Sequence, residues 1–385
     1  MIIIDGHQDL AWNMLTFGRN YTRSAAETRR LEAGKSVETQ GGITLLGWPD
    51  YQRGQVAVIF ATLFVTPERW RGGVWDTQVY SDANQAILRY RSQLDSYRRL
   101  VDEHPEKFQL IQGKADLQAV LAGLNDLKPD RYELFVHGIT PDEREQVQIE
   151  PARDRKVGLV LLMEGAESVR DPGELEDWWA QGVRIIGPAW SGTRFCGGTR
   201  EPGPLTKAGF ALLAGMASLG YVLDISHMDE AAVLQALDFY PGAMIASHAN
   251  VQSLLKGVDS NRHLSERVIR GLIERQAVIG VMPVNPFLQV GWKSGDRRGM
   301  VPLERLIAHI DNICQLAGNA QHVALGSDFD GGFGLQSVPP EIDTIADLRK
   351  LIPMLAGRGY TEVDIAAILG LNWARVLQQH LPEHG

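Results

Sequence analysis

Short apolar runs alternate along this chain with amphipathic stretches, and this pattern predicts its architecture. Eight runs predict strands, at residues 2–7, 56–65, 157–164, 183–189, 221–227, 243–248, 277–282 and 322–328. Several of them are solidly apolar, as is typical of strands that are covered on both faces. Since such strands occur mainly in parallel sheets, the pattern indicates an α/β protein.

Helical stretches separate most of these runs. Residues 229–239 begin with an acidic turn and end before a Pro-Gly pair, and residues 264–276 carry apolar side chains at helical spacing. Eight alternating units predict a closed (β/α)8 barrel, the TIM barrel. We place a ninth apolar run, 108–111, outside the barrel, and expect the last helices, 361–379, to pack beneath or beside it.

The length of 385 residues suits one large barrel with insertions or two domains. We expect a single domain, residues 1–385, with insertions near 66–78 and 126–156. The Gly-, Pro- and Arg-rich residues 283–302 form a long loop, which is a candidate lid.

The amino-acid composition limits the kinds of binding partner that we expect. The net charge of −9, from 38 Lys+Arg and 47 Asp+Glu, argues against nucleic acid as a partner. Only two cysteines are present, which favours a reducing compartment over a disulfide framework. No apolar run is long enough to span a membrane, and no secretory signal is recognised. We therefore expect no membrane partner and a cytoplasmic location.

Ionisable side chains gather at the predicted strand ends. His7 and Asp9 are two residues apart, so they point to the same face where the first strand ends. The C-terminal strand ends of a barrel form its active site, and four later strands also end in such groups. The complete set is His7, Asp9, Glu164, His227, His248 and Asp328. Crowded carboxylates and imidazoles need a counter-charge, and two divalent cations bridged by one carboxylate would supply it. A remaining carboxylate, Asp328, can then transfer a proton to a leaving amine.

Each of these residues also has a purely structural interpretation. A single histidine at a strand end is more often structural than functional. Glu164 before Gly165 could begin a helix, and residues 328–331 could form a plain turn. The coincidence of three histidines and matched acids at strand ends favours the metal site.

The motifs together resemble the membrane (renal) dipeptidase family, peptidase family M19 of the amidohydrolase superfamily. The resemblance covers nearly the whole chain and rests on residues 5–9, 164–165, 224–227, 247–248, 326–331 and 370–376. It implies a TIM barrel of the metal-dependent hydrolase type with two Zn²⁺ ions, although other divalent metals are compatible with these ligands. By this resemblance, His7 and Asp9 hold one ion, Glu164 bridges, and His227 and His248 hold the other.

The same resemblance implies the activity. Asp328 would be the general acid/base, and Arg262 would bind the C-terminal carboxylate of the substrate, for which a guanidinium fork is well suited. The family cleaves dipeptides, often with a D residue at the C-terminal side, and we expect attack by a metal-bridging hydroxide. A dipeptide-like substrate and a homodimer are the partners that the family implies.

Three positions depart from the family pattern. Trp190 stands where the family has a histidine that contacts the substrate carbonyl, Phe64 lies where a tyrosine is frequent, and His263 replaces an asparagine. We interpret Trp190 and Phe64 as substrate-binding residues, although Trp190 could equally be core packing. These changes keep two alternatives open: an amidohydrolase acting on N-acyl amino acids, lactams or lactones, and a non-catalytic barrel that retains its metal.

Overall fold

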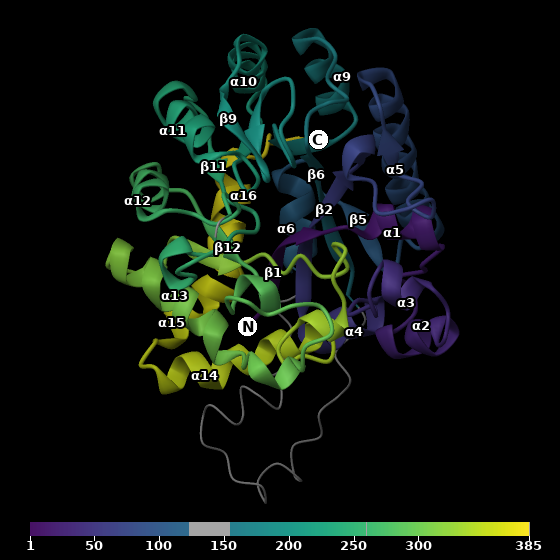
Figure 1. Ribbon diagram of the computed structural model, residues 1–385, viewed down its shortest axis with the longest axis vertical. Helices are drawn as coiled ribbons and strands as arrows, with labels where there is room; N and C mark the ends of the chain where they lie inside the picture. The colour runs from purple at the N-terminus through teal and green to yellow at the C-terminus, as the bar shows by residue number, and fades with distance from the viewer. Residues whose placement is uncertain (123–154, 259, 385) are drawn as a thin grey trace, which may run out of the picture.

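The structure is a computed structural model that describes residues 1–122, 155–258 and 260–384 (Figure 1). The predicted insertion near 126–156 therefore lies almost wholly outside the described residues. Within the described ranges, no helix is both long and apolar enough to cross a membrane.

Eight parallel strands surround the centre of the molecule (Figure 1), and each corresponds to one predicted run. They are β1 (Ile3–Gln8), β2 (Val56–Phe64), β6 (Val157–Glu164), β7 (Val183–Gly187), β10 (Val222–Asp224), β11 (Met244–Ile245), β12 (Ile279–Val281) and β13 (Val323–Leu325). Their order is β11-β10-β7-β6-β2-β1-β13-β12. A parallel bridge between Ala246 and Ile279 joins the two ends, and the amide of Gly280 donates to the carbonyl of Ala246 at 2.7 Å. The predicted barrel is confirmed.

Residues 108–111 lie outside the ring of eight barrel strands, as predicted, although they belong to the same sheet. These residues form β5 (Phe108–Leu110), which joins the same sheet by pairing in parallel with Val157–Leu159 at the start of β6. β7 pairs with β6 only from Leu161 onward, so the first residues of β6 have a free edge on that side. The short strand covers this edge and satisfies its backbone groups.

Helices surround the strands as an outer layer (Figure 1). The predicted α11 (Glu230–Phe239) and α12 (Glu266–Glu274) each begin after a capping residue, Asp229 and Ser265, whose side-chain oxygen accepts from a backbone amide. The other helices that pack around the strands include α1 (Leu10–Phe17), α5 (Ala83–Glu103), α6 (Lys114–Ala122), α9 (Leu175–Ala180), α10 (Lys207–Leu219) and α13 (Glu304–Ala317).

The last described helices close one end of the barrel. α15 (Glu362–Ala366) continues through a π-helical turn into α16 (Asn372–His380), and Trp373 of α16 is fully buried. Its indole packs in one cluster with the inward-facing side chains of the strands, 5.0 Å from the ring of Phe60, and its N–H donates to the carbonyl of Leu325 at 2.8 Å. The predicted position of the last helices beneath or beside the barrel is confirmed.

Two long connecting segments lie at the C-terminal ends of the barrel strands. Residues 66–78 follow β2 and contain β3 (Thr66–Pro67) and a 3-10 turn (Glu68–Trp70), and β3 pairs with β4 (Val79–Tyr80). The candidate lid, 283–302, contains two further 3-10 turns, at Asn285–Phe287 and Arg298–Met300.

Candidate metal centre and active site

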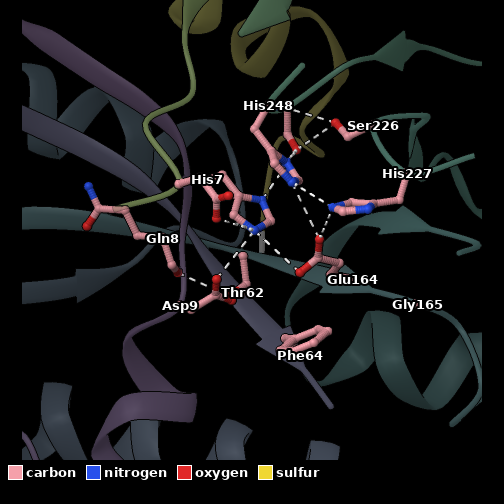
Figure 2. Close-up of polar contacts among 12 residues, drawn as sticks. His7, Gln8, Asp9, Thr62, Phe64, Glu164, Gly165, Ser226, His227 and His248 are labelled. Atoms are coloured by element: carbon pink, nitrogen blue, oxygen red, sulfur yellow. Dashed lines mark hydrogen bonds and ion pairs between the residues drawn. The ribbon is translucent and has the colours of Figure 1, made fainter. Parts of the chain in front are cut away.

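Glu164 lies at the centre of a buried cluster of ionisable groups (Figure 2). One carboxylate oxygen lies 2.9 Å from Nε2 of His227 and 3.5 Å from Nε2 of His248, and the other lies 3.4 Å from Nε2 of His7. Glu164 is the last residue of β6, so its carboxylate lies at the C-terminal end of this strand, where the ends of the other strands also meet. A carboxylate in this position can contact two cations at once.

Two carboxylates complete the cluster on the side of His7. Asp9 Oδ2 lies 3.8 Å and Asp328 Oδ1 lies 4.0 Å from Nε2 of His7. Donor atoms of His7, Glu164 and His248 lie within 4.8 Å of one another, and so do those of His7, Asp9 and Asp328. The structure therefore brings together all six ionisable residues that the sequence placed at strand ends.

Asp328 reaches this cluster from a strained turn. Its φ is +55° and that of Asp330 is +61°, and side chains other than glycine rarely adopt this left-handed conformation. Gly331 follows, and a Cβ at this position would lie 2.8 Å from Oδ2 of Asp9 and would also clash with the Asp328 carboxylate. The glycine is thus required for the two carboxylates to approach each other.

The electrostatics indicate a cation-binding site. Burial alone would lower the pKa of His7, but the nearby carboxylates of Glu164, Asp9 and Asp328 outweigh it and raise the pKa to about 10. Burial raises the pKa of Asp9 and Asp328, and the repulsion among the carboxylates adds to this effect. Burial and the charge of Arg262 lower the pKa of His227 to about 4. Despite its burial, the histidines lower the pKa of Glu164, whereas the adjacent carboxyl groups of Asp9 and Asp328 lack sufficient positive charge from the protein.

The residues fit a divalent metal. Nε2 of His7 is buried and has no hydrogen-bond partner among the described residues, although it faces three carboxylates. Imidazole nitrogens and carboxylate oxygens are the usual ligands of catalytic zinc and of related ions. A metal ion here would supply the missing counter-charge and a partner for this nitrogen.

Hydroxyl groups orient the imidazole rings. Ser247 Oγ lies 2.8 Å from Nδ1 of His248 and 3.4 Å from Nδ1 of His7, and Thr199 Oγ1 lies 2.9 Å from Nδ1 of His227. Such partners fix the ring orientation and tautomer of metal-binding histidines. Ser247 belongs to one of the motifs found in the sequence, whereas nothing in the local sequence around Thr199 predicts its contact with His227.

A second buried network supports the turn that carries Asp328. The Asp330 carboxylate accepts hydrogen bonds from Arg19 at 3.1 Å, from the hydroxyl of Tyr21 at 3.0 Å, and from the amide of Leu45 at 2.9 Å. Arg19 also pairs with Glu32 at 3.0 Å. These contacts connect the turn after β13 to the segment between β1 and β2, and no local sequence pattern predicts them.

Arg262 is buried beside the cluster. Its guanidinium donates to the backbone carbonyls of Ser226 and His248, both at 2.8 Å, and lies 5.8 Å above the ring of Phe287. It also lines the main cavity, as does Arg200. Since two of its five N–H groups hold the backbone, the guanidinium has donors left for a ligand.

The cavity has a volume of about 390 Å³ and contains the cluster in its wall. Its lining includes Phe64 and Trp190, whose ring centroids are 5.2 Å apart, and Trp190 lies 6.2 Å from the ring of His227. Phe287, from the candidate lid, also contributes. Such a cavity is in the size range of small-molecule sites.

Known proteins with similar sequences include members of one peptidase family. A model of the membrane dipeptidase family, peptidase family M19, matches residues 141–382. An uncharacterized protein in the pqqA 5′ region of Klebsiella pneumoniae is 34% identical over 241 residues, which cover 60% of this chain and 85% of that protein. The dipeptidase tcpJ of Claviceps purpurea is 25% identical over 178 residues, which cover 46% of this chain and 38% of that protein.

The fold also has solved relatives. The crystal structure of a metallopeptidase from Rhodobacter sphaeroides, liganded with a phosphinate mimic of the dipeptide L-Ala-D-Ala, has a TM-score of 0.74 and 22% sequence identity. The superposition covers 99% of each chain. The probable dipeptidase PvdM from Pseudomonas aeruginosa has a TM-score of 0.71 and 18% identity, with 99% of this chain and 96% of that chain covered. These structures share the complete barrel fold.

Proposed function

The chain belongs to the membrane dipeptidase family, peptidase family M19. We propose that it hydrolyses the peptide bond of dipeptides at the cluster around Glu164. The observation that carries the proposal is the convergence of three histidines and two further carboxylates on the space around Glu164. The phosphinate mimic of L-Ala-D-Ala in the Rhodobacter sphaeroides relative supports a dipeptide substrate that tolerates a D residue at the C-terminal side.

We assign two Zn²⁺ ions to the cluster. His7 and Asp9 would hold one ion, His227 and His248 would hold the other, and Glu164 would contact both. When bound, such ions polarise a substrate carbonyl and lower the pKa of a water molecule. The hydroxyl partners Ser247 and Thr199 keep the rings of these histidines oriented toward the shared carboxylate.

Two positively charged side chains orient the substrate. Arg262 and Arg200 line the same cavity, and Arg200 directly follows Thr199, the partner of His227. These two guanidinium groups provide the end of the cavity that accepts the C-terminal carboxylate. The scissile bond then lies beside Glu164.

Asp328 transfers the proton. Its carboxyl group lines the cavity and lies beside His7 and Asp9, within reach of a group bound at the cluster. It takes a proton from the attacking water and delivers it to the leaving amine, as general acid/base catalysis requires. Trp190 and Phe64 form part of the wall around the reacting peptide.

A substrate panel tests this function. Purified, zinc-loaded protein is assayed with L-L dipeptides, L-D dipeptides and N-acyl amino acids, with Asp328→Asn as the control. We expect cleavage of free dipeptides that falls by at least roughly 10²-fold in the variant. Failure of the loaded protein to cleave any dipeptide would refute the proposal.

A second candidate function rests on Trp190 and Phe64. They line the cavity where the family pattern has a histidine and a tyrosine, so the imidazole and phenol groups expected to contact the substrate backbone are replaced there. An amidohydrolase acting on N-acyl amino acids, lactams or lactones would need fewer such contacts. Cleavage of acylated substrates only would favour this alternative.

We also propose a cytoplasmic homodimer, which gel filtration and cell fractionation would test.

A further inference from the structure

The insertion at residues 66–78 forms one wall of the main cavity. Five of its residues line the cavity: Thr66, Trp70, Gly72, Trp75 and Asp76. Trp75 faces two aromatic rings of α1, with its centroid 6.1 Å from that of Trp12 in an edge-on arrangement and 5.6 Å from that of Phe17 in a stacked one. We call Trp12 and Trp75 the tryptophan wall; Trp70 is not part of it, because Arg200 lies 4.9 Å above the Trp70 ring.

The Trp75 ring is held in place by two neighbouring groups. Phe17 stacks on it, and a Cβ at Gly72 would lie 2.8 Å from its Cζ2 atom, so the loop backbone lies directly against the ring. Trp12 is buried and lies one helical turn after Asp9. Because aromatic groups in such contacts lose little further freedom on binding, the wall is preorganised for a ligand.

The wall and Arg262 lie at different sides of the cluster. Trp12 follows Asp9 from the end of β1, whereas Arg262 is anchored to the carbonyls of Ser226 and His248, which follow β10 and β11. If Arg262 holds the C-terminal carboxylate, the first residue of a dipeptide extends past Glu164 toward Asp9. Its side chain then meets the tryptophan wall.

Resting on the proposed function, we propose that the tryptophan wall is the subsite for the N-terminal side chain of the dipeptide and selects large apolar or aromatic side chains. Indole rings present a large apolar area and stack favourably on other rings. Asp76 is buried in the same wall, and its carboxylate disfavours an acidic side chain at this position. The insertion that follows β2 thereby sets which dipeptides the enzyme cleaves.

Specificity constants test this assignment. The zinc-loaded enzyme is assayed with Phe-Ala, Ala-Phe, Ala-Ala and Asp-Ala. Burying a phenyl ring favours Phe-Ala over Ala-Ala by about 10- to 100-fold in kcat/KM. Trp75→Ala should lower this ratio by about tenfold or more, and Trp75→Phe should retain part of it.

Val74→Ala is the matched control. Val74 precedes Trp75 in the same loop, and its side chain is 92% exposed and does not line the cavity, so its removal should leave the ratio unchanged. A Phe-Ala to Ala-Ala ratio near one in the unmodified enzyme, or an unchanged ratio in Trp75→Ala, would overturn the subsite alone. A preference that depends on Trp75 for Ala-Phe instead of Phe-Ala would also overturn it. No cleavage of any dipeptide would overturn the proposed function and this subsite together.

Discussion

Removing the hydroxyl of Ser247 should weaken metal binding without removing a metal ligand. Ser247 Oγ donates to the Asp224 carboxylate at 2.6 Å, so its proton is already used. The ring N–H at Nδ1 of His248 must therefore donate to Ser247 Oγ, at 2.8 Å, which leaves the lone pair on Nε2 facing Glu164. The same oxygen lies 3.4 Å from Nδ1 of His7. One hydroxyl thus orients two of the proposed ligands.

The expected effect follows from these contacts. Loss of such a partner of a metal-binding histidine typically lowers metal affinity by about 10- to 100-fold, which corresponds to about 1.4–2.7 kcal/mol. Ser247→Ala should show this loss and an equal decrease in activity at limiting zinc, with recovery of most activity at saturating zinc. The buried Asp224 carboxylate keeps its bonds from the amides of Ser226 and Ser247 and from the Ser226 hydroxyl, so the protein should still fold.

Chelator competition measures this affinity, and Ser226→Ala is the control. Ser226 Oγ also donates to Asp224, at 2.6 Å, but it accepts from the amide of His248 and contacts no imidazole nitrogen. Its removal therefore costs a comparable hydrogen bond and should leave zinc affinity within about threefold of the unmodified protein. Equal zinc affinities in Ser247→Ala and the unmodified protein, or equal losses in both variants, would refute the argument.

Four further outcomes are expected. Trp373→Ala should lower the free energy of unfolding by about 3–5 kcal/mol in urea titrations, because it empties the centre of the barrel, and a loss below 1 kcal/mol would contradict this position. His309 is buried and accepts from the amide of Val251, and burial lowers its pKa to about 4. Its unfolded form takes up a proton near pH 6.5, so His309 alone should lower the stability of the metal-free protein by up to roughly 3 kcal/mol as the pH falls from 6.5 to 4. This loss should shrink in His309→Gln, and identical pH profiles would exclude the effect. Arg262→Lys should raise KM at least about tenfold for dipeptides but not for their C-terminal amides, and equal changes for both would remove the carboxylate-binding role. Asp9→Ala should lose at least one zinc ion and nearly all activity, and full metal content by elemental analysis would show that Asp9 is not a ligand.

The positions of the six clustered residues could be predicted because they depend on local periodicity. His7 lies in β1 and Asp9 directly follows this strand, and parallel strands of a barrel place all their C-terminal ends together. Glu164 ends β6 at the predicted residue, since the preceding apolar run is continuous and long. Topology and pattern were therefore sufficient to place these residues.

Other features depend on contacts between distant segments, which no local pattern reveals. β5 joins the sheet because the start of β6 has a free edge, a fact that depends on where β7 begins. Thr199 contacts His227 across 28 positions, and Asp330 contacts Arg19 across 311. The tryptophan wall depends on how the 66–78 insertion folds against α1. Residues in irregular segments are positioned by tertiary contacts, so periodicity carries little information about them.

The position of Trp373 has a consequence for biosynthesis. Gly6, in β1, makes room for this indole, since a Cβ there would lie 2.9 Å from its ring, and the next residue is His7. The base of the barrel beneath the first ligand of the metal centre is thus completed by a residue that lies far along the chain from it. Contacts between such distant positions form slowly, and only after both segments have been synthesised. The nascent protein consequently cannot complete the base beneath its metal centre until α16 has been synthesised, and truncation before α16 would yield a barrel with an open base.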